Sequence, residues 1–175
     1  MTKQSKRWKG CEREVARRFG GRRVPLSGRN SGHDTAADAM DSEEGEVEFP
    51  DFLYIETKRD NTLNKLFEHY HEVLHGGMIV AFALEDVYYV AFELDLFLEG
   101  KCVKVGNGEW TRAFNALHRI YCDAKVKAVH EDSTEAIVVC KLHGRRGYFV
   151  FTQWDALKRL EEWRKCQAKN LSMRH

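Results

Sequence analysis

The sequence has little proline, no long apolar run and no paired cysteine motif. Its 175 residues include two prolines, so no Pro-rich linker divides it and we expect one domain over 1–175. No stretch approaches the roughly 18 apolar residues of a membrane span, and the start lacks the apolar segment of a secretory signal. Five cysteines without a CxxC pair indicate reduced thiols. We therefore expect a cytoplasmic protein, in the host cytoplasm if viral, with no membrane partner.

Net charge is also nearly absent, at +1, but the charges separate along the chain. Residues 1–29 carry ten basic and two acidic side chains, and residues 136–175 carry nine and three. Residues 30–56 carry nine acidic side chains and no Lys or Arg. Two basic ends around an acidic middle fit a polyanion-binding surface beside a carboxylate-rich centre. Two solvated basic helices and an acidic loop are the alternative.

Apolar periodicity predicts an α/β fold with a mixed central sheet flanked by helices. We expect helices over 6–19, 61–75, 110–122 and 155–168. We expect strands over 52–58, 78–84, 87–98, 136–142 and 148–154. The acidic stretch at about 41–49 is interpreted as a loop insertion, and the last strand and helix as a C-terminal extension. Residues 79–95 and 137–155 echo each other, which we interpret as shared strand chemistry.

The strand FLYIETK at 52–58 carries the most informative residues. Side chains alternate along a strand, so Glu56 and Lys58 emerge on one face of a segment that is otherwise apolar. Glu56 could hold a hard divalent cation, and Lys58 could orient a water or neutralise a phosphate beside it. A strand end with a structural ion pair is the alternative.

The first helix carries a second candidate carboxylate. Glu12 lies at helical spacing from Trp8, Val15 and Phe19, so it points with the apolar face, whereas Glu14 points away among arginines. A carboxylate aimed at a core needs a partner, and a metal ion would supply one. Glu12 at the rim of this face, reaching water, is the alternative.

The segments KGCEREVARRF, SGRNSG and PDFLYIETK, in this order, resemble the PD-(D/E)xK nuclease superfamily. Within it they resemble the archaeal and phage Holliday-junction resolvases, over roughly residues 5–75. The resemblance implies a restriction-endonuclease-like core and a DNA endonuclease that depends on Mg²⁺ or Mn²⁺. It also implies a homodimer that cuts branched DNA in recombination and repair.

The resemblance further implies which residues form the site. The spacing of apolar residues maps the family's helix glutamate onto Glu12, although counting from the lysine–glycine pair favours Glu14. The family's ExK pair maps onto Glu56 and Lys58. Ser27 falls where these enzymes carry a serine near the site.

The family's strand aspartate has two candidates here. Asp51 spells the motif after Pro50, but five residues of extended strand place it roughly 16 Å from Glu56. Ligands of one Mg²⁺ must lie within about 4 Å of each other, so Asp51 can serve only if the chain bends. Asp38 can reach Glu56 across a hairpin that turns within the acidic loop, so we favour it, with Asp41 and Glu46 behind both.

Basic residues in loops and turns are candidates for contacts with DNA phosphates. We place Arg22, Arg23, Arg29, Arg145 and Arg146 in this group, together with Ser27. Ordinary surface arginines are the alternative.

Two zinc patterns and a loss of cleavage compete with this interpretation. His71, Glu72 and His75 form an HExxH motif typical of zinc proteases, but Gly76-Gly77 end the helix at once and no metzincin histidine follows. A homologue that binds DNA without cutting it is the other functional alternative. A looser zinc pattern has finger-like spacing, although buried thiols explain it more simply: His118, Cys122, Cys140 and His143.

We predict that Asp38→Ala abolishes metal-dependent DNA cleavage and retains DNA binding, whereas Asp51→Ala keeps substantial activity. Second-shell partners already cost about 10- to 100-fold when lost, so a direct ligand costs more. Cleavage time courses of both variants beside Glu56→Ala, with circular dichroism to check folding, decide this. An inactive Asp51→Ala beside an active Asp38→Ala would show that the chain bends before Glu56.

Overall fold

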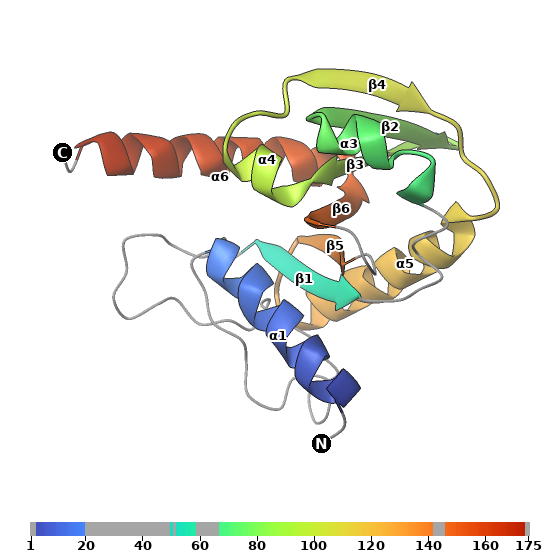
Figure 1. The fold of residues 1–175 in the computed structure, drawn as a ribbon, viewed down its shortest axis with the longest axis horizontal. Helices are drawn as coiled ribbons and strands as arrows, with labels where there is room; N and C mark the ends of the chain where they lie inside the picture. Colours follow the sequence, from blue (N-terminus) through green and yellow to red (C-terminus); the bar gives the residue numbers. More distant parts are fainter. Residues whose placement is uncertain (1–2, 20–49, 51, 59–66, 142–145, 174–175) are drawn as a thin grey trace.

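A mixed sheet forms the centre of the chain (Figure 1). The structure is a computed structural model and describes residues 3–19, 50, 52–58, 67–141 and 146–173. Its strands are β1 Leu53–Lys58, β2 Met78–Leu84, β3 Val87–Glu93, β4 Lys104–Gly108, β5 Glu135–Lys141 and β6 Tyr148–Gln153. Its helices are α1 Lys3–Arg18, α3 His71–His75, α4 Leu94–Leu98, α5 Phe114–His130 and α6 Trp154–Met173. In these ranges the sheet has six strands, in the order β1-β5-β6-β3-β2-β4, which confirms the predicted α/β fold.

Two apolar layers cover opposite faces of this sheet. One contains the inward residues of α1, α4 and α6, packed against Leu53 and Ile55 of β1. The other contains those of α3 and α5, packed against Tyr54. Because side chains alternate along a strand, Glu56 lies on the same face of β1 as Tyr54. The α5 layer therefore covers the face that carries Glu56, and α1 covers the opposite face.

The helix predicted at 6–19 is α1, and its buried face is the predicted one. Val15, Ala16 and Phe19 are completely buried, at the i, i+1 and i+4 spacing of one helical face. Arg13 and Arg17 are exposed on the other side. The helix therefore docks by a narrow apolar stripe and leaves Arg13 and Arg17 in water.

The echo between residues 79–95 and 137–155 has a geometric counterpart. The hairpins β2–β3 and β5–β6 have equivalent registers, with Val80 opposite Ala91 in one and Val138 opposite Phe151 in the other. β3 and β6 pair antiparallel with Ala91 opposite Phe151, so a pseudo-twofold axis passes through that pair. Each hairpin also has a parallel neighbour, β4 beside β2 and β1 beside β5. The sheet is thus built from two related halves.

The predicted elements differ from the structure at several points. The strand predicted at 87–98 ends at Glu93, because the Glu93 side chain accepts a hydrogen bond from the Leu96 N–H at 3.0 Å and so caps α4. The helix predicted at 110–122 continues to His130. Strand β4 was not expected, since its sequence KVGNG has the glycine content of a loop. Of the helix predicted at 61–75, the structure describes residues from Phe67 onward.

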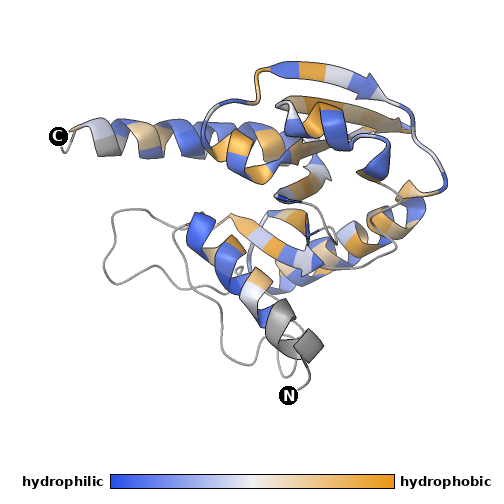
Figure 2. Cartoon of the chain, in the orientation of Figure 1, coloured by the Kyte–Doolittle hydropathy of each residue, from blue (hydrophilic) through white to orange (hydrophobic). Residues whose placement is uncertain are grey.

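The last helix packs on the sheet only near its start. Ala156, Leu157 and Leu160 are buried, whereas the following residues are exposed or half-buried. Figure 2 shows mostly polar residues where α6 extends past the sheet. Among the described residues, no helix is long and apolar enough to span a membrane.

We predict that Phe151→Ala lowers the free energy of unfolding by about 3–5 kcal/mol, because it empties a fully buried position on the pseudo-twofold axis. Phe151 also stacks on Tyr89 with ring centroids 5.3 Å apart. Urea denaturation measures the change. The control Val126→Ala, at a 59% exposed position, should stay within about 0.5 kcal/mol of the parent. Equal effects of the two variants would contradict the placement of the core.

Candidate functional site at the edge strand β1

Glu56 is a buried carboxylate on an edge strand. Its exposed fraction is 2%, and the other residues of the strand are buried except the half-buried Lys58 at its end. In the described part of the chain, β1 pairs on one side only, with β5. Burying an unpaired carboxylate is costly, so the cations around Glu56 decide whether it stays charged.

Two lysines and a tyrosine contact this carboxylate. Lys58 Nζ lies 3.1 Å from Glu56 Oε1, and Lys127 Nζ of α5 lies 3.5 Å from Oε2. The Tyr54 hydroxyl donates to Oε2 at 3.3 Å. The Lys58 and Lys127 side chains are 31% and 33% exposed, so both ammonium groups also reach the surface. The predicted pairing of Glu56 and Lys58 on one face of the strand is confirmed.

Lys127 is a candidate residue that the sequence did not reveal to us. The predicted helix ends at residue 122, about two turns before the observed end at His130. The signal was present, because the buried residues Phe114, Leu117, Tyr121, Ala124 and Ala128 continue one helical stripe. Extending that stripe places Lys127 beside the sheet.

Glu12 is the second buried carboxylate, with an exposed fraction of 1%. It shares the inward face of α1 with Val15 and Ala16, as predicted. This face packs against Leu53 and Ile55, so β1 lies between the helix and the face that carries Glu56. A common site for the two carboxylates would have to form around the outer edge of β1.

The other predicted ligands lie outside the described residues. These are Asp38, Asp51, Asp41 and Glu46, and the hairpin proposed for Asp38 stays a prediction. Within the described ranges, no three His, Cys, Asp or Glu side chains are grouped so as to hold a metal ion. A complete metal centre on β1 would therefore need a ligand from outside the described ranges.

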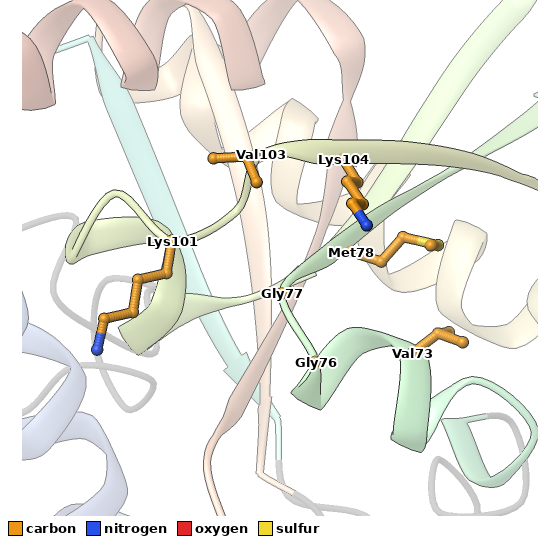
Figure 3. A pocket seen from close by; sticks show the side chains of 7 residues that line it. All are labelled: Val73, Gly76, Gly77, Met78, Lys101, Val103 and Lys104. Atoms are coloured by element: carbon orange, nitrogen blue, oxygen red, sulfur yellow. The ribbon is translucent and has the colours of Figure 1, made fainter.

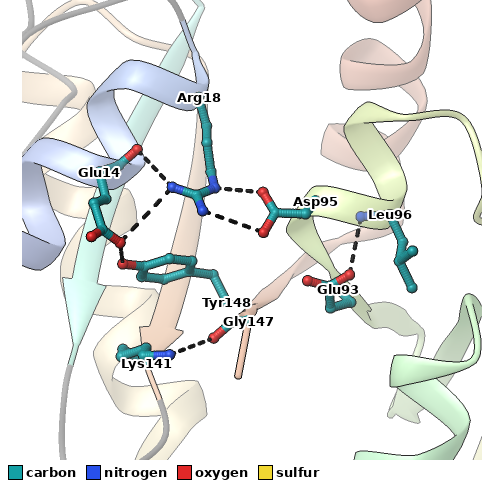
Figure 4. A network of polar contacts seen from close by, with 8 residues as sticks. All are labelled: Glu14, Arg18, Glu93, Asp95, Leu96, Lys141, Gly147 and Tyr148. Carbon is teal, nitrogen blue, oxygen red and sulfur yellow. Dashed lines mark hydrogen bonds and ion pairs between the residues drawn. The ribbon is translucent and has the colours of Figure 1, made fainter. Parts of the chain in front are cut away.

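Glu14 takes part in a different network, which anchors α1 (Figure 4). The Tyr148 hydroxyl donates to Glu14, and Arg18 lies with its guanidinium 4.8 Å from the Tyr148 ring centroid. Arg18 Nε also donates to Asp95 Oδ1 of α4 at 2.5 Å. Burial, and then the hydrogen bond to Glu14, raise the pKa of Tyr148. This network fixes the orientation of α1, and Glu14 is committed to it.

The HExxH histidines do not form a zinc site in the described structure. The His71 and His75 rings stack with centroids 5.1 Å apart, and no third ligand from the described ranges joins them. His71 packs against Phe149 and Leu74 is fully buried, so this short helix mainly covers the core. The zinc protease alternative gains no support from this geometry.

The second zinc pattern contains a thiol of the core. Cys140 is completely buried in β5, and burial raises its pKa to about 12. His118 Nε2 lies 2.9 Å from the Tyr89 hydroxyl and 3.6 Å from Cys122 Sγ. His143 lies outside the described residues. Cys140 is therefore a packing residue, because zinc binds the thiolate form.

Most of the predicted DNA contacts also lie outside the described residues: Arg22, Arg23, Ser27, Arg29 and Arg145. Arg146 is described and exposed, next to the start of β6. Nearby, Lys141 Nζ at the end of β5 donates to the Gly147 carbonyl at 3.4 Å. Cations thus occur where β5 and β6 meet the 142–145 connection.

A cavity of about 270 Å³ lies at the other edge of the sheet (Figure 3). Its lining residues are Val73, Gly76, Gly77, Met78, Lys101, Val103 and Lys104. The titratable groups in this lining are Lys101 and Lys104, and it contains no carboxylate, histidine, hydroxyl or thiol. Unlike β1, it therefore offers no carboxylate that could bind a metal ion.

Comparisons with protein-family models, curated proteins and solved structures find no match for this chain. The resemblance to PD-(D/E)xK nucleases therefore stays a prediction. What the structure adds is the geometry of Glu56 and its two lysines.

We predict that a maleimide at pH 8 modifies Cys166 and Cys122 of the folded protein but not Cys140. The first two are exposed, whereas Cys140 is buried and its raised pKa leaves a negligible thiolate fraction at this pH. Mass spectrometry of proteolytic fragments locates the adducts. Unfolding in urea should make Cys140 reactive, and rapid labelling without urea would contradict its burial.

Proposed function

We propose that this protein is a DNA endonuclease that depends on Mg²⁺ or Mn²⁺, with its active centre on β1. The observation that carries the proposal is the buried carboxylate of Glu56 with Lys58 Nζ 3.1 Å away. A carboxylate beside a lysine on one strand face could bind a divalent cation and orient a water for phosphodiester hydrolysis. The sequence resemblance supports the same chemistry, and with it a restriction-endonuclease-like core.

The two halves of the sheet provide an internal control for this interpretation. Ile55 of β1 lies beside Ile137, and Val105 of β4 lies beside Ile79 in the related half. The same registers place Gly106 where β1 has Glu56, and Gly108 where β1 has Lys58. The fold therefore does not need an acid–lysine pair at this position, which supports a functional origin for it.

The described residues contribute a carboxylate donor for a hard divalent cation on β1. Glu56 supplies a buried carboxylate, and its Oε2 already faces a cationic group, Lys127 Nζ, at 3.5 Å. Glu56, Glu12 and Asp38 are the residues proposed to hold the ion. Bound Mg²⁺ or Mn²⁺ would lower the pKa of a coordinated water and offset charge on the scissile phosphate.

The chain's own residues supply the remaining functions. Lys58 holds its ammonium group beside Glu56 while remaining 31% exposed, so it can orient a water or neutralise a phosphate oxygen. Helix α1 carries seven basic and two acidic residues, a charge suited to a phosphate backbone. Tyr54 restrains the Glu56 carboxylate from the buried side.

The finer features follow from the resemblance and are part of the proposal. They are a branched DNA substrate such as a Holliday junction, a homodimer that places one centre on each of two strands, and a location in the cytoplasm. A polypeptide with one active centre hydrolyses one strand at a time, which fits a dimer. Function is argued from the site, because related folds carry different activities.

We predict that the protein nicks or cuts branched DNA with Mg²⁺ or Mn²⁺, and that EDTA stops the reaction. Glu56→Gln should lower the rate by more than about 100-fold, since it removes a proposed ligand. The matched control is Glu135→Gln on the neighbouring strand β5. It removes a half-buried carboxylate that pairs with Lys125 of α5. Gel-based cleavage of branched and linear duplexes measures these rates.

Three results would contradict the proposal. Binding of DNA without cleavage of any branched or linear substrate would favour the homologue that has lost cleavage. Equal activity of Glu56→Gln and Glu135→Gln would place the chemistry elsewhere. Cleavage of casein that His71→Ala abolishes would favour the zinc protease.

A further inference from the structure

We propose that Lys127 is a positioning residue that acts as an internal counter-ion of Glu56 and competes with the divalent cation for this carboxylate. Lys127 would hold Oε2 while the ion is absent and would release it to face the substrate phosphate once the ion binds. This inference rests on the proposed function, because it assumes that Glu56 is a metal ligand. It adds a residue that neither the ExK motif nor the resemblance contains.

The charges around Glu56 are the first argument. Lys58 Nζ, at 3.1 Å from Oε1, already supplies one positive charge for the one negative charge of the carboxylate. Lys127 adds a second positive charge, from a helix 71 residues further along the chain. Within the described residues, two ammonium groups therefore contact this one buried carboxylate. A positive charge next to Oε2 opposes the binding of a further cation at that oxygen and suits the approach of a phosphate.

The geometry of the contact is the second argument. The 3.5 Å between Lys127 Nζ and Oε2 is at the long end for a hydrogen bond, so this contact is weaker than that of Lys58. The Lys127 side chain is 33% exposed and flexible. The ammonium group can therefore leave Glu56 for the surface without movement of the backbone.

Lys125, on the same helix, has contacts typical of a structural lysine. Lys125 Nζ donates to the Thr134 carbonyl at 2.5 Å and lies 3.3 Å from Glu135 Oε2. It thereby ties α5 to the start of β5. Lys127 contacts a candidate ligand instead of the backbone, although both lysines lie near the C-terminal end of α5, where a cation is favoured.

The experiment measures Mn²⁺ affinity in the absence of DNA, by electron paramagnetic resonance of free Mn²⁺ and by calorimetry. We expect Lys127→Met to bind Mn²⁺ about tenfold more tightly than the parent, because it removes a like charge near Oε2. The matched control Lys125→Met should bind as the parent does. Glu56→Gln should lose this site, which shows that the measured ion is bound at Glu56.

Lys127→Arg separates charge from packing, since it keeps the positive charge and should keep parental affinity. If Lys127→Met does not fold by circular dichroism, Lys127→Gln serves in its place. A purely structural role predicts lower stability with unchanged Mn²⁺ affinity. Unchanged or weaker affinity in the neutral variants would therefore overturn the inference.

The failure of this inference is distinguishable from the failure of the proposed function. If the parent binds Mn²⁺ through Glu56 and cleaves DNA, but the neutral variants bind no more tightly, only the role of Lys127 is wrong. If the parent binds no Mn²⁺, or if Glu56→Gln binds it equally well, the metal centre is not at β1. Both proposals then fall together.

Discussion

The buried charge of Glu56 is the constraint on which the candidate site depends. Removing a carboxylate from water costs several kcal/mol, and nearby cations must offset that cost. Lys58 comes from the same strand, but Lys127 comes from α5, so the helix must lie close to β1. The small buried residues Ala124 and Ala128 face the sheet and permit this close approach. The packing of α5 against the sheet thus also brings a positive charge to the Glu56 carboxylate.

Helix α1 is held by a second set of charges on the opposite face. Its apolar stripe is narrow, and Arg18 extends the contact by pairing with Asp95 and lying over Tyr148. Because these groups belong to α4 and β6, the anchor ties α1 to the sheet and to a neighbouring helix. Glu12 lies on the same inward face of α1 as Val15 and Ala16, so its burial follows from this docking.

The sequence was sufficient where a pattern depends on near neighbours. Alternation in FLYIETK predicted which residues share a face with Glu56, and helical spacing predicted the burial of Glu12. The sequence was insufficient where the end of an element or a contact depends on a residue outside the local pattern. Glu93 ends β3 because its side chain accepts a hydrogen bond from the Leu96 N–H, and apolar periodicity does not predict that bond. Lys127 meets Glu56 only because β1 and β5 pair in parallel under α5, a relation that no local pattern encodes.

The two halves of the sheet differ in the side chains that their edge strands can carry. Phe82 of β2 occupies the register position that Cys140 occupies in β5. A Cβ at Gly108 would lie 2.3 Å from the Phe82 ring, so β4 has no room for a side chain there. Beside the smaller Cys140, β1 carries Lys58 instead. Cys140 is smaller than Phe82. The edge strand β1 therefore has room for the Lys58 side chain, whereas β4 has none at Gly108.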